Sequence, residues 1–477
     1  MSDPHDEFKG KNVLIERKKS KDPSEITSKY SMSIETYKDI LGECRRKLFE
    51  VRSRRARPHL DDKVSPMSLK RSYASRLLYL GMDWLSHLFP GPTRFSWVKL
   101  RKSINELLPL ELLQAILVRV PAKHLFPLRF VSKLWLSLIS DPTFVEFHFH
   151  HTSEFTIPSY FFAHNDQLVG SVDLHALFHG GATLDTSIEK FSLPFPWKKN
   201  TRSNLLVLGS CRGFVLLRHY PYYIILWNPV TQSHKKISYY NAVKKNNIIH
   251  GIGYDASNDD YVIVIFSKEN QPHCFSLRTN SWTKIDVAPP TPLITYEFIP
   301  WGLFFNGAIH WLSYRPSNRD ILIFDVKKRR FSKIPLPEQK LTWWPSKLVI
   351  LGGCLALNFF DYRDNNKRTQ VWVLKKYKVP SSWILLYEIP HHCISLFLSN
   401  YSDVIVLDRV TMNFAKYKLE GERVQCFKYF NYSFCHVIAF EHISTVYTPS
   451  LATLPSCDKK KWKNEDIKFV KDDWNPT

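Results

Sequence analysis

The chain has little glycine, no paired-cysteine motif and no long apolar run among its 477 residues. Its 16 glycines form no phosphate-cradling loop, and neither a GxSxG nor an HExxH pattern occurs, so no cofactor and no hydrolytic or metal centre is expected. The eight cysteines are scattered, without a CxxC pair or a histidine at zinc spacing. They predict reduced thiols in a cytoplasmic or nuclear protein.

Membrane attachment and secretion are not expected either. The nearest candidate for a span, residues 77–89, is shorter than the roughly 20 residues that cross a bilayer and includes Asp83 and His87. The first residues, MSDPHDEFKGK, lack the apolar stretch behind a basic start that a secretory signal needs. A composition of 44% apolar and 23% charged residues is instead typical of a globular protein.

Positive charge is in excess, because 66 Lys and Arg against 44 Asp and Glu give a net charge of +22. Such an excess favours acidic partners or nucleic acid. No basic–aromatic signature of a nucleic-acid module is present, however, so a generally basic solvated surface is the preferred interpretation. Nucleic-acid binding would require the charge to gather on one face.

Composition divides the chain into five segments. Residues 1–64 are polar, charged and helix-tending, and residues 65–103 form a basic linker. Residues 104–150 are a leucine-rich helical block, and residues 155–454 alternate strand-like runs with turn residues. Residues 455–477 are a charged tail. We therefore expect an α+β multidomain protein, with a small helical domain ahead of a large all-β domain.

A weak repeat predicts how the β domain is built. The stretches ILWNPVTQSHKKI (225–237), CFSLRTNSWTKI (274–285) and IFDVKKRRFSKI (323–334) each join an apolar strand to a polar turn and a second strand that ends in Lys-Ile. A looser copy ends at Ile389. The copies lie 48 and 49 residues apart, which matches one four-stranded blade of a β-propeller. The roughly 300 residues allow about six blades; a large β-sandwich is the alternative.

The helical block has more apolar surface than it can cover by itself. Leu113, Ile116, Leu117 and Val120 recur at helical spacing after Pro109, and Pro121 ends this first helix. A second short helix is expected around 124–128, and a third carries Leu128, Val131, Trp135 and Leu138 on one face until Asp141-Pro142 stops it. A block of about 40 residues is marginal as a free domain. Its helices therefore either cap the β domain or dock on a partner.

The block closely resembles an F-box. The matching positions are Leu-Pro at 108–109, Ile116-Leu117, Val-Pro at 120–121, Val-Ser-Lys at 131–133, Trp135 and the stretch SLISDPTF at 137–144. Pro127 departs from the pattern of the family, and we expect it to shorten or kink the start of the third helix.

The β domain resembles the kelch-like F-box-associated domain of plant F-box proteins. The pieces LGSCRGFVLL, LWNPVT, GIGYDASNDDYVIV, FSLRTNSWTKI, FFNGAIHWL and FDVKKRRFSKIPLP occur in that order, followed by YTPSLATL at 447–454.

Together the two resemblances imply a non-catalytic substrate-recognition subunit of an SCF-type, cullin-RING ubiquitin ligase. The F-box would dock on a Skp-type adaptor, and the β domain would hold an unknown protein substrate. The residues expected at the adaptor interface are Leu108, Pro109, Leu113, Ile116, Leu117, Pro121, Leu125, Val131 and Trp135. The polar loops 239–247 and 361–368 are candidates for the substrate face.

The alternative is a propeller outside the ubiquitin system, acting as a binding protein or a hydrolase. Its candidate catalytic residues are Asp255, Asp259, Asp260, His310 and Asp325. Aspartates are common in turns for structural reasons, and a histidine next to Trp311 is typical of a core position. The residues therefore favour a protein without catalytic activity.

Residues 3–19 and 37–64 resemble a different family, the spermatogenesis-associated, thioredoxin-domain-containing proteins. Only an internal piece is present, and the thioredoxin CxxC is absent. A piece of a larger domain cannot bury its own core, so residues 1–64 are not expected to fold independently. A gene fusion or a wrongly joined gene model explains such an arrangement.

Overall fold

The computed structural model describes residues 110–454, apart from 156–157, 165–167, 194–204, 220–222, 240–247, 268–269, 287–301, 313–319, 339–342, 362–367, 400–401, 410, 412 and 429–443. The segments 1–64, 65–103 and 455–477 lie outside these residues. The chain divides into two compact units between Val120 and Pro121.

Helix α5 (Leu110–Leu117) belongs to the first unit. Leu113 and Leu117 are buried, whereas Leu110 is exposed. Beyond the helix, the Arg119 and Val120 N–H groups donate to carbonyls three residues back, each at 3.1 Å. The helix was expected to continue to Val120, but a residue before a proline disfavours helical dihedrals, which accounts for the earlier end ahead of Pro121.

Three helices open the second unit: α6 (Ala122–Leu128), α7 (Lys133–Ser140) and α8 (Pro142–Phe155). The expected third helix began at Leu128, but the structure ends α6 there and begins α7 at Lys133. Ser132 caps α7, because its hydroxyl accepts the Trp135 N–H at 3.2 Å. Pro127 consequently lies inside α6.

Helix α8 was not expected. Asp141-Pro142 ends α7 as predicted, but the same pair also begins a new helix. The Asp141 carboxylate accepts the Phe144 N–H at 3.0 Å, and proline suits the first helical position because the N–H that it lacks would have no partner there.

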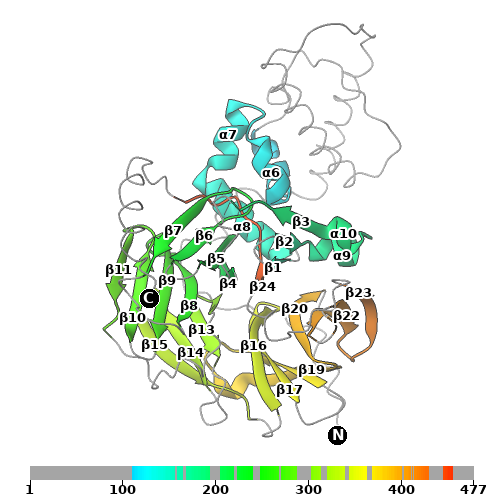
Figure 1. Ribbon diagram of the computed structural model, residues 1–477. Helices are drawn as coiled ribbons and strands as arrows, with labels where there is room; N and C mark the ends of the chain where they lie inside the picture. The colour runs from blue at the N-terminus through cyan, green and yellow to red at the C-terminus, as the bar shows by residue number, and fades with distance from the viewer. Residues whose placement is uncertain are drawn as a thin grey trace, which may run out of the picture. The chain divides into compact units, whose positions relative to one another are not determined.

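The rest of the second unit is a six-bladed β-propeller, and the β-sandwich alternative is wrong (Figure 1). Each blade is an antiparallel four-stranded sheet whose first strand lines the centre of the ring. In order from the innermost strand, blade 1 is β24 (Ser444–Tyr447), β1 (Ser159–His164), β2 (Leu168–Val172) and β3 (Ile188–Phe191); blade 2 is β4 (Leu206–Cys211), β5 (Phe214–His219), β6 (Tyr223–Trp227) and β7 (His234–Ser238); blade 3 is β8 (Ile249–Asp255), β9 (Asp260–Ser267), β10 (Asn270–Ser276) and β11 (Ser281–Lys284).

The remaining blades follow the same plan. Blade 4 is β12 (Leu303–Phe305), β13 (Ala308–Leu312), β14 (Asp320–Asp325) and β15 (Arg330–Pro335); blade 5 is β16 (Trp343–Leu351), β17 (Cys354–Asp361), β18 (Arg368–Leu374) and β19 (Trp383–Pro390); blade 6 is β20 (Cys393–Ser399), β21 (Asp403–Asp408), β22 (Phe414–Lys418) and β23 (Arg423–Phe427). Helices α9 (Leu174–His179) and α10 (Leu184–Ser187) lie in the β2–β3 connection, and the 3-10 helix η4 (Pro380–Ser382) precedes β19.

The sequence repeat corresponds to the two outer strands of successive blades. The three clear copies form β6–β7, β10–β11 and β14–β15, and the looser copy forms β18–β19. The closing isoleucines, from Ile237 to Ile389, are all buried. Middle strands such as β9 are buried on both faces because blades pack on either side, which explains their continuous apolar runs. The hairpin predicted at Asn306-Gly307 is present, with φ of 47° and 73°.

The ring closes by pairing the two ends of the β domain. Strand β24, red in Figure 1, joins blade 1 beside β1, with Tyr160 opposite Val446. The Tyr160 hydroxyl lies 2.5 Å from the Ser444 hydroxyl, and the Tyr160 ring packs edge-on against Phe414 of blade 6. The following residues cross blade 2, where the Asn228 amide donates to the Ser450 and Ala452 carbonyls at 3.0 and 2.8 Å.

Candidate functional site

The residues expected at an adaptor interface divide by exposure. Leu108 and Pro109 lie outside the described residues. Leu113, Leu117, Leu125 and Trp135 are buried, and Ile116, Pro121 and Val131 are half-buried. The buried members pack within the helical segment and the half-buried ones are partly accessible, and the adaptor interface itself stays a prediction.

Two apolar side chains that were not among the expected interface residues are the most exposed ones of α6–α8. Phe130, between α6 and α7, is 67% exposed, and Leu136 on α7 is 46% exposed. Because α7 begins at Lys133, its buried face carries Trp135, Leu138 and Ile139, and Leu136 lies outside that face. The sequence signal for this face is the capping residue Ser132, which sets the start of the helix.

Helix α8 is attached to the propeller through Arg212. This arginine lies in the β4–β5 turn, at a φ of 48°, and forms an ion pair with Glu146 of α8. Its guanidinium lies 4.8 Å from the centre of the Phe149 ring on α8 and 4.1 Å from that of Tyr254 on β8. The Tyr254 hydroxyl in turn donates to Asp259 at 2.7 Å. One side chain thus connects α8 to blades 2 and 3.

Charge pairing explains the protonation states at this contact. The hydrogen bond from His150 and the Arg212 charge lower the pKa of Glu146, although partial burial opposes them. Burial alone would lower the pKa of Arg212, but Glu146 together with Tyr261, Tyr254 and Cys211 outweighs it, and the pKa is raised. The pair is therefore charged at neutral pH and weakens only when Glu146 is protonated in acid.

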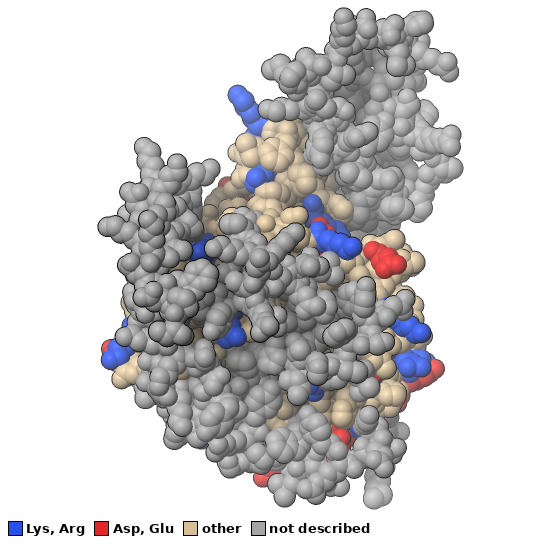
Figure 2. Space-filling model, viewed as in Figure 1, with Lys and Arg blue, Asp and Glu red and all other residues tan. Residues whose placement is uncertain are grey.

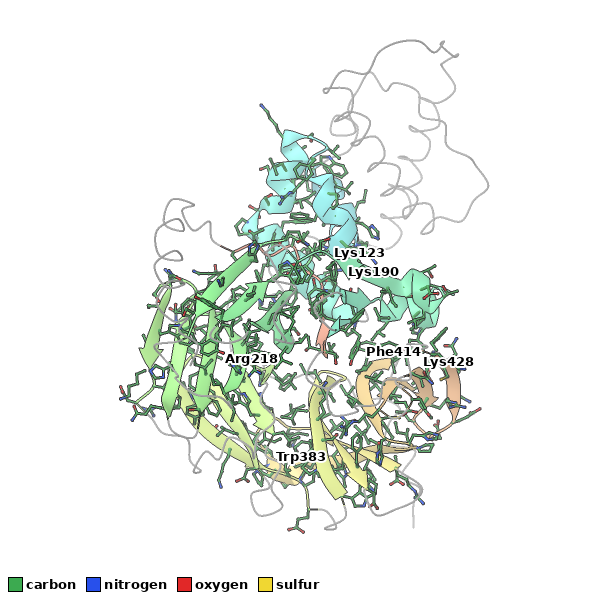
Figure 3. All side chains as sticks on the ribbon, in the orientation of Figure 1. Lys123, Lys190, Arg218, Trp383, Phe414 and Lys428 are labelled. Carbon is green, nitrogen blue, oxygen red and sulfur yellow. The ribbon has the colours of Figure 1, made fainter. Side chains whose placement is uncertain are left out.

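A second ion pair attaches α6 to blade 1. Lys123 Nζ lies 2.9 Å from Asp173 Oδ2, and Figure 3 shows Lys123 over this blade. Asp173 also caps α9, because its other oxygen accepts the Ala176 N–H at 3.0 Å. Burial opposes ionisation of Asp173, yet Lys123 and the N–H group together hold its pKa below the usual range.

The centre of the propeller contains a cavity of about 490 Å³. Its walls come from inner strands such as β4, β16 and β24, and the α8 residues Phe149, His150 and Ser153 line one end. Helix α8 therefore covers part of the mouth on the side of the β4–β5 turn.

The candidate catalytic residues are engaged in structural hydrogen bonds. Asp255 accepts the Ser257 N–H at 3.0 Å, and Asp260 accepts the Arg278 N–H at 2.8 Å. Asp325 likewise accepts the Lys328 N–H at 2.8 Å. His310 is buried between the Tyr377 hydroxyl and the Leu303 carbonyl, at 2.9 and 3.2 Å, and burial lowers its pKa to about 4. Each of these side chains holds a turn or a strand pair.

Metal-binding clusters and membrane-spanning helices are absent from the described part of the chain. No group of His, Cys, Asp and Glu residues there is arranged to hold a metal ion. No helix there has the length and apolar character needed to span a bilayer. On the face shown in Figure 2, the described Lys and Arg residues are dispersed, several of them beside Asp or Glu.

Comparison with known families agrees with this architecture. Residues 161–454 match the F-box associated beta propeller domain, and residues 106–147 match the F-box domain. The chain belongs to the F-box-associated β-propeller family. Helices α5 to α7 and the start of α8 thus lie within the F-box, and the six blades form the associated domain.

Relatives of this F-box protein occur in Arabidopsis thaliana. An F-box/kelch-repeat protein is 25% identical over 59% of this chain and 79% of its own length. The F-box protein CPR1 is 26% identical over 59% of this chain and 73% of its own length. Among solved structures, a protein of unknown function from Bacteroides caccae aligns at a TM-score of 0.36 and 8% identity, over 61% of this chain and 98% of its own.

Proposed function

We propose that this F-box protein is a substrate-recognition subunit of an SCF-type ubiquitin ligase in the cytoplasm or nucleus and supplies no catalytic group itself. The observation that carries the proposal is an F-box whose helices α6 and α8 are attached to a propeller by Lys123 and Arg212. A recognition subunit must hold its substrate at a fixed distance from the ligase, and these ion pairs join the docking helices to the binding domain.

The Skp-type adaptor is proposed to contact the exposed apolar side chains of the F-box. Phe130 and Leu136 are the described candidates on the second unit, and Leu110 is the candidate on α5. Large exposed apolar residues at interfaces often account for much of the binding free energy. The half-buried Ile116, Pro121 and Val131 remain predicted to contact the adaptor.

The test is co-purification of the full chain with a plant Skp-type adaptor. Leu136→Asp is expected to weaken capture, with a loss on the order of 2 kcal/mol, because it places a charge in an apolar contact. Ser137→Asp is the matched control, since Ser137 is an exposed neighbour on α7. Equal capture of the wild type and a correctly folded Leu136→Asp protein would contradict the proposed interface. Leu113→Asp is less informative, because a buried charge disrupts folding.

The substrate is proposed to bind at the propeller end away from α8. Strand β8 runs from Ile249 to Asp255, and Tyr254, near its end, contacts Arg212 beside α8. Ile249 is five residues earlier, so roughly 17 Å of strand separates it from that contact. The β7–β8 connection, which contains most of the predicted loop 239–247, joins β8 at this far end; residues 240–247 and 362–367 lie outside the described residues.

A further inference from the structure

The six blades provide a comparison of six outer strands, and one of them differs from the rest. Five are short and carry charged residues, which discourage pairing with another chain. These are β3 (IEKF), β7 (HKKIS), β11 (SWTK), β15 (RFSKIP) and β23 (RVQCF). The sixth, β19, has eight residues, WILLYEIP, and no charge before Glu388.

The outer side of β19 is apolar and unpaired among the described strands. In the sheet of blade 5 it pairs with β18 alone, where Ile384 lies opposite Val373 and Leu385 opposite Trp372. The side chains of Ile384 and Leu385 are 37% and 44% exposed. A long apolar edge strand presents free N–H and C=O groups that can pair with an added strand.

The strand is held in place at both ends. Trp383 is buried, and its indole N–H donates to the Pro335 carbonyl of blade 4 at 3.1 Å (Figure 3). At the other end, Gly421 in the β22–β23 turn lies beside the Glu388 carbonyl, where an added Cβ would be in van der Waals contact. The accessible edge is therefore the stretch from Trp383 to Tyr387, which is long enough to pair with a short extended peptide.

Charge around this edge is positive. Lys376 and Lys378 in the β18–β19 connection are exposed. Glu388 does not offset them, because the Arg368 guanidinium and the Gln370 amide each donate to its carboxylate at 2.9 Å. If a second copy of this chain paired through its own β19, it would bring the same lysines. Its Glu388 would already be bonded to Arg368 and Gln370 of its own chain, so no carboxylate of that strand would be left to pair with Lys376 and Lys378. A segment with its own acidic residues fits better.

We propose that the outer edge of β19 binds an extended segment of a partner protein, which adds to blade 5 as a fifth strand. The segment is apolar where it covers Ile384 and Leu385, whose side chains point to opposite faces of the strand, and acidic where it meets Lys376 and Lys378. This interaction belongs to the propeller alone and does not depend on adaptor binding, so either proposal can fail without the other.

The test measures binding of a fluorescent eight-residue peptide, in which two Glu residues at each end flank four apolar residues, to the full chain by anisotropy. Leu385→Glu is expected to raise the Kd at least about tenfold, since the edge loses an apolar contact and gains a charge of the same sign as the peptide. Val424→Glu is the matched control, because it adds the same charge at an apolar residue of similar exposure, 46%, on the outer strand of blade 6. A peptide methylated on alternate backbone nitrogens, which cannot complete the strand ladder, is expected to lose binding, and Lys376→Glu with Lys378→Glu is expected to weaken it.

Three results would overturn the inference. Equal effects of Leu385→Glu and Val424→Glu would indicate a non-specific effect of charge. Undiminished binding of the methylated peptide would exclude strand addition. A dimer of the wild type that Leu385→Glu dissociates, seen by analytical ultracentrifugation, would make a second copy the occupant.

Discussion

At the residue scale, buried histidines make the propeller sensitive to acid. His310 is fully buried, and burial lowers its pKa from 6.5 to about 4. Burial likewise lowers the pKa of His250 to about 3. The unfolded chain binds these protons near pH 6.5, whereas the folded chain does not until the pH is much lower. Folded stability is therefore complete above pH 6.5 and falls as the pH decreases toward the folded pKa values.

His310→Gln should make stability less dependent on pH. The wild-type free energy of unfolding is expected to fall between pH 6.5 and 4, with His310 contributing up to about 1.4 kcal/mol per pH unit. The variant loses that contribution, although it is less stable at pH 7 because the bond to Tyr377 changes. Urea denaturation across this pH range measures both effects, with exposed His234→Gln as control. Parallel pH profiles for wild type and His310→Gln would show that this site is not responsible.

At the element scale, α8 connects the F-box to the propeller. The sequence predicted the end of α7 at Asp141-Pro142 but not the helix that follows, because the signal that ends one helix also begins the next. Contacts of α8 with the β domain depend on Arg212, which lies 66 residues from Glu146 in the chain. A local pattern contains no information about a pair this far apart.

Arg212→Gln is expected to loosen α8 without unfolding the blades. The change removes the charge that Glu146 pairs with and the cation above the Phe149 and Tyr254 rings. Loss of a partly buried, charge-assisted hydrogen bond costs about 1–3 kcal/mol. Hydrogen exchange should accelerate in residues 142–155 and remain slow in β9. Lys333→Gln, which breaks the Lys333–Asp320 pair within blade 4, is the control and should leave α8 unchanged.

At the scale of the whole molecule, stability depends on closing the ring. Strand β24 supplies the inner strand of blade 1, although the other strands of that blade come from the start of the β domain. The Ser444 and Tyr160 hydroxyls that meet there are 284 residues apart. Without β24, the buried side chains of Phe161 and Phe162 would lose neighbours on the inner side of the blade.

A chain ending at residue 443 is therefore expected to misfold or aggregate. A chain ending at Leu454, which lacks only the charged tail, should keep the melting temperature of the full protein. Size-exclusion chromatography and thermal melting distinguish the two truncations. Equal melting temperatures for both would mean that β24 does not close the propeller.

The sequence alone predicted a propeller and left a β-sandwich as the alternative, because each blade is a run of adjacent hairpins. Apolar runs, turn residues and the buried isoleucines from Ile237 to Ile389 recur about every 50 residues, so they can be recognised from the local periodicity of the sequence. It also identified the F-box motif. The tertiary structure decided which apolar residues of that motif face solvent, how Arg212 holds α8, how β24 closes the ring and which blade edge is unprotected. These features depend on contacts between segments far apart in the chain, and on burial from several sides at once, which no local pattern encodes.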